Sequence, residues 1–187
     1  MAESQKPIEL EDDTKEPMSL LIEHRLPWLI IGLLGGLCLT FVSAKFEDLL
    51  TENIGLAFFI PLIVYMASAV GTQTDTVYIR NLDKKRTHFS IYLVKEFSLG
   101  VFLGLVFGTI TGSFAYLIFQ STGLALSIGI SMAVTMAIAP IVALIVPTVL
   151  KRVHKDPAIG TGPFVTVIQD FLSLFIYFSV ATMIILK

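Results

Sequence analysis

Two carboxylates lie inside otherwise apolar stretches of this sequence. Asp75 falls in PLIVYMASAVGTQTDTVYIR, and Asp170 falls in GPFVTVIQDFLSLFIYF. A charged side chain at the centre of a lipid bilayer costs about 2.5–3.5 kcal/mol on insertion scales, so it usually faces a bundle interior or a water-filled path. Two such residues on separate segments indicate a protein that handles a cation or a proton inside a membrane.

Oxygen-bearing residues accompany both carboxylates at helical spacing. Around Asp75 they are Ser68, Gly71 and Thr72, and around Asp170 they are Thr166, Ser173 and Tyr177. Residues three or four apart share one face of a helix. Hard divalent cations prefer oxygen ligands, and magnesium keeps several waters while taking only one or two carboxylates. The alternative is helix packing through polar hydrogen bonds. The pattern predicts a metal site made of Asp170, Asp75, Thr166, Gly71, Thr72 and Ser173.

The composition is that of a membrane protein. Apolar residues make up 55% of the chain and charged residues 15%, whereas a soluble domain carries about 25% charged residues. The mean hydropathy is +0.81. The single cysteine, Cys38, excludes an internal disulfide. We therefore expect a lipid bilayer around the chain and no nucleic-acid partner.

The elements that must hold these carboxylates are apolar runs, each long enough for the roughly 20 residues that a membrane-spanning helix needs. No alternating strand pattern is present, so the fold class is predicted to be an all-α integral membrane domain over 26–187 with five transmembrane helices. Residues 1–25 are predicted to form a polar, acidic cytosolic tail. The five predicted segments are Leu26–Ala44, Ile54–Arg80, Leu93–Phe119, Leu124–Leu150 and Gly162–Leu186.

Basic residues predict the orientation, because loops on the cytoplasmic side carry an excess of lysine and arginine. They precede the first segment and fill the connections between the second and third and between the fourth and fifth. All of these fall on one side if the N-terminus is inside and the C-terminus outside. In the second segment Asp75 lies near Arg80, and in the fifth Asp170 follows Gly162, so both carboxylates are predicted in the inner half, at compatible depths.

Small residues predict where helices approach closely. Gly100, Gly104, Gly108 and Gly112 recur every fourth residue and form a smooth ridge for helix packing. Gly35 belongs to a similar small face on the first segment. Pro61, Pro140 and Pro147 interrupt apolar runs and predict kinks. Glu96, near the start of the third segment, is expected either to pair with a basic loop residue or to attract cations.

The sequence resembles the transmembrane domain of MgtE-type magnesium channels and their animal solute-carrier relatives. The matching stretches are RLPWLIIGLLGG (25–36), AFFIPLIVYMASAVGTQTDTVYIR (57–80), KEFSLGVFLGLVFGTITG (95–112) and VPTVLKRVHKDPAIGTGPFVTVIQDFLSLFIYF (146–178). The resemblance implies a homodimer with a central ion path between the second and fifth helices of both subunits. It also implies that Asp170 binds hydrated Mg²⁺.

The chain departs from the family at two points. Ala69 stands where the family usually has asparagine, and Asp75 stands where a small residue is common. The family's large cytosolic regulatory region is expected to be absent, because about 25 residues precede the first segment.

These observations predict a channel or transporter for divalent cations, magnesium first, spanning a bacterial or archaeal cell membrane several times. One alternative is an exchanger coupled to sodium or protons, and another is a membrane scaffold subunit that transports nothing. An intramembrane aspartyl protease also uses two membrane aspartates, but neither Asp75 nor Asp170 follows a Gly-x-Gly motif. No enzymatic activity is expected.

Overall fold

The structure is a computed structural model, and it describes residues 17–82, 88–153 and 157–185. Its helices are α1 (Met18–Ala44), α2 (Glu47–Glu52), α3 (Ile54–Leu82), α4 (Phe89–Phe119), α5 (Thr122–Arg152) and α6 (Pro157–Ile185). All but α2 are long and apolar enough to cross a membrane, which confirms the five predicted spans. Most of the predicted tail, residues 1–16, lies outside the described residues.

The helix boundaries differ from the predicted segments mainly at the ends. Helix α1 begins at Met18, well before the predicted start at Leu26, and continues through Pro27. The short helix α2, which no apolar run predicted, connects the first two spans. The prolines expected to kink the spans lie within continuous helices: Pro61 in α3, and Pro140 and Pro147 in α5.

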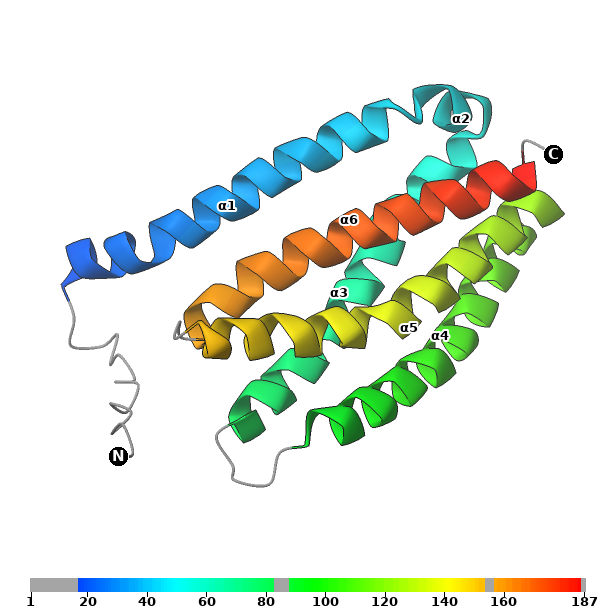
Figure 1. Ribbon diagram of the computed structural model, residues 1–187. Helices are drawn as coiled ribbons and strands as arrows, with labels where there is room; N and C mark the ends of the chain where they lie inside the picture. Colours follow the sequence, from blue (N-terminus) through cyan, green and yellow to red (C-terminus); the bar gives the residue numbers. More distant parts are fainter. Residues whose placement is uncertain (1–16, 83–87, 154–156, 186–187) are drawn as a thin grey trace.

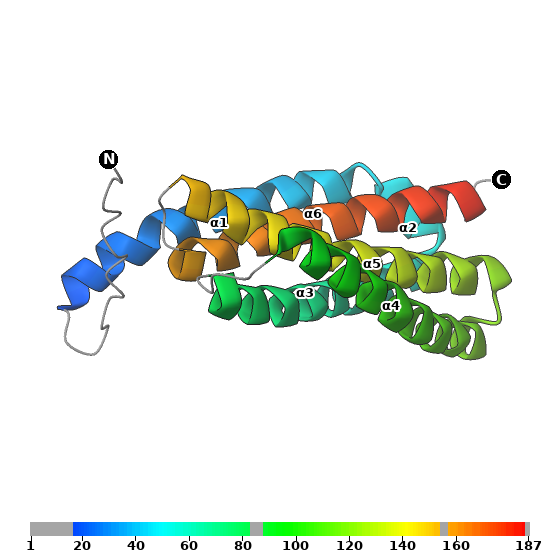
Figure 2. The same ribbon diagram turned by 60° about the horizontal axis from the view of Figure 1, so that its bottom comes forward.

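Helix α5 is the centre of the bundle. It packs against α3, α4 and α6, while α1 lies at the edge and packs mainly against α6 (Figure 1). Its side chains Ile128, Met132 and Met136 are fully buried in the hydrophobic core. Helices α1, α4 and α6 run in one direction along the bundle and α3 and α5 in the other (Figure 1 and Figure 2), so α3 and α6 lie side by side in opposite directions.

The glycine ridge on α4 packs directly against α5, as its spacing predicts. A Cβ atom at Gly104 would lie 2.5 Å from the carbonyl oxygen of Ala133, and one at Gly108 would lie 2.5 Å from that of Gly129. On the opposite side of the bundle, a Cβ at Gly35 would overlap the side chain of Val167 on α6. Small residues therefore let α4 approach α5, and α1 approach α6, at backbone distance.

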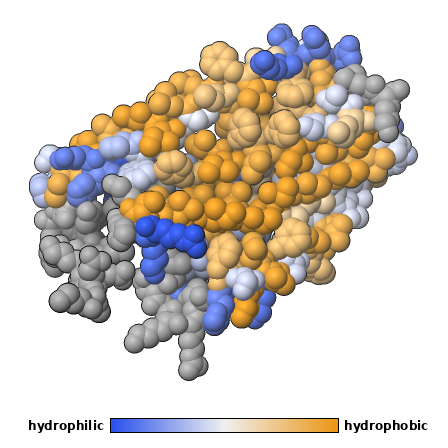
Figure 3. All heavy atoms as spheres, in the orientation of Figure 1, coloured by the Kyte–Doolittle hydropathy of each residue, from blue (hydrophilic) through white to orange (hydrophobic). Residues whose placement is uncertain are grey.

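The surface separates an apolar belt from polar ends. In Figure 3 the hydrophobic atoms cover the middle of the bundle and hydrophilic atoms gather toward its ends. The start of α1, the end of α3, the start of α4, the end of α5 and the start of α6 all lie at one end of the bundle (Figure 1). This arrangement is the one expected of helices that cross a bilayer.

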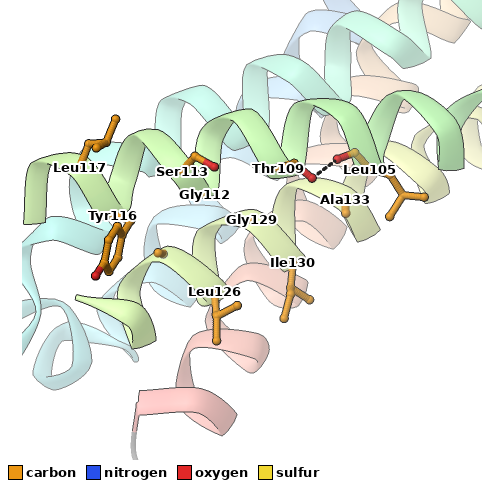
Figure 4. A pocket seen from close by; sticks show the side chains of 12 residues that line it. Leu105, Thr109, Gly112, Ser113, Tyr116, Leu117, Leu126, Gly129, Ile130 and Ala133 are labelled. Carbon is orange, nitrogen blue, oxygen red and sulfur yellow. Dashed lines mark hydrogen bonds between the residues drawn. The ribbon is translucent and has the colours of Figure 1, made fainter. Parts of the chain in front are cut away.

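A groove of about 560 Å³ opens between the C-terminal half of α4 and the N-terminal half of α5. Figure 4 shows Tyr116, Leu126 and Ile130 at its wall, with the backbone of Gly112 and Gly129 close together. Its lining is mainly apolar and contains no carboxylate. The groove therefore lacks the charge that a cation site needs.

A hydrogen bond of Tyr177 joins the C-terminal half of α6 to the start of α3. The buried hydroxyl of Tyr177 donates to the carbonyl oxygen of Leu56 at 2.8 Å. We expect Tyr177→Phe to lower the free energy of unfolding by about 1 kcal/mol, the usual net value of such a bond. Thermal denaturation in detergent measures this change, with Tyr65→Phe, an exposed tyrosine on α3, as the matched control. Equal midpoints for the two variants would contradict the expectation.

Candidate functional site

Asp170 lies at the seam where α3 and α6 meet. Its Oδ1 accepts a hydrogen bond of 3.1 Å from the hydroxyl of Ser68 on α3. The side chain of Asp170 is half-buried, and so is that of Ser68. The bond joins residues that are far apart in the sequence, and it places a carboxylate among otherwise apolar helices with one side still open.

Two threonines extend this seam by one helical turn. Thr72 follows Ser68 on α3, and Thr166 precedes Asp170 on the antiparallel helix α6, so both lie on the same side of the carboxylate. Both are exposed. The hydroxyl of Thr166 donates to the carbonyl oxygen of Gly162 at 2.9 Å, which leaves its oxygen lone pairs available to a further donor such as an ion's water.

Asp75 lies farther along α3, on the face that carries Ser68. It is two turns beyond Ser68 on α3, about 10 Å along the axis at 1.5 Å per residue. Only 7% of its surface is exposed, and its Oδ1 accepts a bond of 3.2 Å from the hydroxyl of Thr76. Asp75 on α3 and Asp170 on α6 therefore lie at different levels along the bundle, because Asp170 is level with Ser68.

The remaining predicted residues, Gly71 and Ser173, are buried between helices. Ser173 and Thr135 line a small cavity between α5 and α6. The backbone of Gly71 faces the side chain of Gln169. The structure thus brings Asp170, Thr72 and Thr166 to the open seam, while it places Ser173 in the interface with α5.

Sequence reasoning missed Gln169, which ties α6 to α5, and did not predict the hydrogen-bond partner of Glu96. Gln169 donates from Nε2 to the carbonyl oxygen of Ala139 on α5, at 3.0 Å. Glu96 on α4, which was predicted to pair with a basic loop residue or to attract cations, accepts a 2.9 Å hydrogen bond from the hydroxyl of Thr74 on α3; loop residues 83–87 lie outside the described residues. Helical spacing alone does not tell which neighbouring helix a side chain meets.

The atoms at the seam that could bind a metal ion are all hard oxygen atoms. Among the residues that the structure describes, no three His, Cys, Asp or Glu side chains lie close enough together to hold a metal ion. A carboxylate with hydroxyls around it suits a cation that keeps its water shell, because magnesium takes few protein ligands directly. The arrangement can therefore order the waters around a hydrated divalent ion.

Comparisons with known proteins agree with this chemistry. The family model MgtE, described as a divalent cation transporter, matches residues 60–180. The chain is 35% identical over 163 residues to the magnesium transporter MgtE of Bacillus subtilis, covering 85% of this chain and 36% of the relative. It is 31% identical over 183 residues to the magnesium transporter MgtE of Enterococcus faecalis, covering 94% and 39%. The chain thus spans less than two fifths of the length of these relatives.

Proposed function

The chain belongs to the MgtE family of divalent cation transporters, and from this premise we propose that it carries a divalent cation, magnesium first, across a membrane past Asp170. The observation that supports this most directly is the half-buried Asp170 carboxylate, which lies at the seam between α3 and α6 and is bonded to Ser68. Placing an ionised group among apolar helices is costly, and a transported cation supplies its counter-charge. The protein moves an ion and catalyses no reaction.

The ion passes with much of its water shell in place. Magnesium gives up its waters reluctantly and binds through one or two carboxylates. The Asp170 carboxylate provides the charge, while the exposed hydroxyls of Thr72 and Thr166 bind waters of the shell. Asp75, about 10 Å farther along α3, holds the ion at a second position on the same path.

A homodimer completes the path. In the single chain the seam leaves Asp170 half-exposed and Thr72 and Thr166 exposed, and a polar surface of this kind is unfavourable against lipid. In a dimer with a two-fold axis, the seam of one subunit packs against the same seam of the other, because a two-fold interface uses the same patch on both subunits. Two Asp170 carboxylates then face one central ion.

The protein lies in the cell membrane with its N-terminus in the cytosol. Arg80, Lys95 and Arg152 all lie toward the end of the bundle that holds the start of α1, and an excess of basic residues marks the cytoplasmic side. The C-terminus of α6 then lies outside. A negative membrane potential favours inward cation movement, by about 2.3 kcal/mol per charge per 100 mV.

Magnesium flux into liposomes that contain the purified full chain tests the proposal. We expect uptake, read by an enclosed magnesium-sensitive dye, that follows the magnesium gradient and the membrane potential and is absent from protein-free liposomes. An opposing sodium or proton gradient is imposed in parallel. Flux that requires this gradient would make the protein a coupled exchanger, and no flux of any divalent cation would contradict the proposal.

Asp75 is expected to tune affinity rather than to permit transport. Asp75→Ala removes one negative charge from the path, and we expect the half-saturating magnesium concentration to rise by about tenfold, equivalent to 1.4 kcal/mol. The maximal flux and the folded fraction change little, because the hydrogen bond that the structure gives Asp75 comes from its neighbour Thr76. A concentration series of flux measures this, and curves that superimpose on those of the parent would exclude Asp75 from the path.

A further inference from the structure

Gln169 occupies a junction of three helices. It is 2% exposed, and its Nε2 donates to the carbonyl oxygen of Ala139 on α5 at 3.0 Å. A buried amide is costly unless it is hydrogen-bonded, so this contact holds the side chain on α5. The Nε2 end of the amide is therefore committed to the contact with α5.

Helix α3 packs against the other side of the Gln169 amide. A Cβ atom built on Gly71 would overlap Nε2 of Gln169 and would lie 2.6 Å from its Cδ and Oε1. Only a residue without a side chain leaves room for the amide at this level. Gly71 thus forms a socket for Gln169 in the backbone of α3.

The next residue along α6 is the ion-site carboxylate. Asp170 accepts its hydrogen bond from Ser68, which lies one turn before Gly71 on the same helix. Two consecutive side chains of α6 therefore meet two consecutive turns of α3, while one of them also bonds to α5. Such a pair of contacts determines both how α6 is rotated about its axis and how far it is shifted along α3.

We propose that Gln169 is a positioning residue that, seated in the Gly71 socket and bonded to Ala139, sets the rotation and register of α6 so that Asp170 faces the seam. Its consequence for transport rests on the function proposed above, whereas its consequence for helix register does not. A glycine that only allows close packing stabilises the bundle without setting the rotation or register of α6. Gly55, which packs on Leu124 and Phe119 at the other end of α3, is a glycine of this type.

A disulfide between Ser68→Cys and Asp170→Cys reports the register directly. Cys38, the only native cysteine, is first replaced by alanine. Because Ser68 and Asp170 are in hydrogen-bond contact, mild oxidation is expected to join the pair quickly in the full chain. We expect Gly71→Ala to slow this cross-linking severalfold, since the new methyl group displaces Gln169, and Gln169→Ala to slow it as well, since the hydrogen bond to Ala139 is then lost. The double variant should be slowed no more than the slower single variant, because both changes break one contact.

The control is Gly55→Ala, which introduces the same methyl group on the same helix. Substitutions at sites farther apart than about 10 Å have additive effects. The effects of Gly55→Ala and Gln169→Ala on the cross-linking rate and on the stability should therefore add in the double variant. Equal slowing by Gly55→Ala and Gly71→Ala, no slowing by Gln169→Ala, or losses that multiply when Gly71→Ala and Gln169→Ala are combined would overturn the proposal.

Flux gives the second readout, with Ser68, Asp170 and Cys38 left native. We expect Gly71→Ala to reduce magnesium flux by about tenfold to a hundredfold, as ångström-scale misplacement of a functional group does. The variant that combines Gly71→Ala with Gln169→Ala should lose no more flux than the worse of the two single variants. Independent losses that multiply in the double variant would also contradict the proposal. If the parent protein carries no flux but the cross-linking behaves as expected, the proposed function fails and the positioning role stands.

Discussion

Asp170→Asn is expected to abolish magnesium flux through the reconstituted protein while the bundle stays folded. Asparagine has nearly the same shape as aspartate and keeps an oxygen that can accept the hydrogen bond from Ser68, so the seam between α3 and α6 is preserved. What disappears is the negative charge. Attraction between a carboxylate and a divalent ion about 5 Å away amounts to several kcal/mol at an effective dielectric constant of about 20, and each 1.4 kcal/mol is worth about tenfold.

Flux into liposomes under an inward magnesium gradient measures the effect, and we expect a loss of about a hundredfold or more, by the same conversion of free energy. The matched control is Asp48→Asn, which makes the same change at an exposed position on α2 and should leave flux unchanged. Size-exclusion profiles check that both variants fold. A folded Asp170→Asn protein with parental flux would remove Asp170 from the ion path.

Gly104→Leu is expected to disrupt the packing of α4 on α5. A Cβ at Gly104 would lie 2.5 Å from the carbonyl oxygen of Ala133 and within 3.2 Å of two further backbone atoms of that residue. Backbone cannot rotate away as a side chain does, so the two helices must separate along the ridge. Overpacking of this kind costs about 3 kcal/mol or more, which is a large part of the stability of a small domain.

Gly36→Leu provides the comparison, because a Cβ at Gly36 meets nothing within 4 Å. We expect Gly104→Leu to give an aggregated or much less stable protein in detergent, and Gly36→Leu to give a profile like that of the parent. Fluorescence-detected size exclusion and thermal denaturation measure both. A Gly104→Leu variant as stable as Gly36→Leu would mean that the ridge does not carry the interface.

The number and type of spans were predictable from the sequence because hydropathy and length act locally. An apolar run of sufficient length forms a helix wherever backbone hydrogen bonds must be satisfied without water, and the structure has five such helices. The glycine spacing on α4 likewise predicted a close helix contact, since a repeat of four places the residues on one face. The start of α1 at Met18 and the short helix α2 were not predictable, because polar residues at a helix end carry no such signal.

The two membrane carboxylates were also evident from the sequence, as charged residues in apolar surroundings. Their partners were not. Ser68, Thr72 and Asp75 lie on one broad face of α3, yet Ser68 meets α6 while the adjacent Thr74 meets α4 through Glu96. Polar residues spaced three and four apart cover a wide part of the helix surface. That part of α3 can contact two neighbouring helices, here α6 and α4.

The rotation of each helix against its neighbours followed from packing and not from any local sequence pattern. Ser173 shares the predicted polar stripe with Asp170 but lies in the interface with α5, whereas Gln169, outside the stripe, bonds to α5 at Ala139. One residue of helix corresponds to a rotation of about 100° at 3.6 residues per turn, which is enough to exchange an open seam for a buried interface. The sequence alone determined which helices form and which oxygen atoms they carry. The packing of Gln169 against Gly71 and Ala139 determined which of those atoms reach the seam, because packing free energy depends on all three helices together.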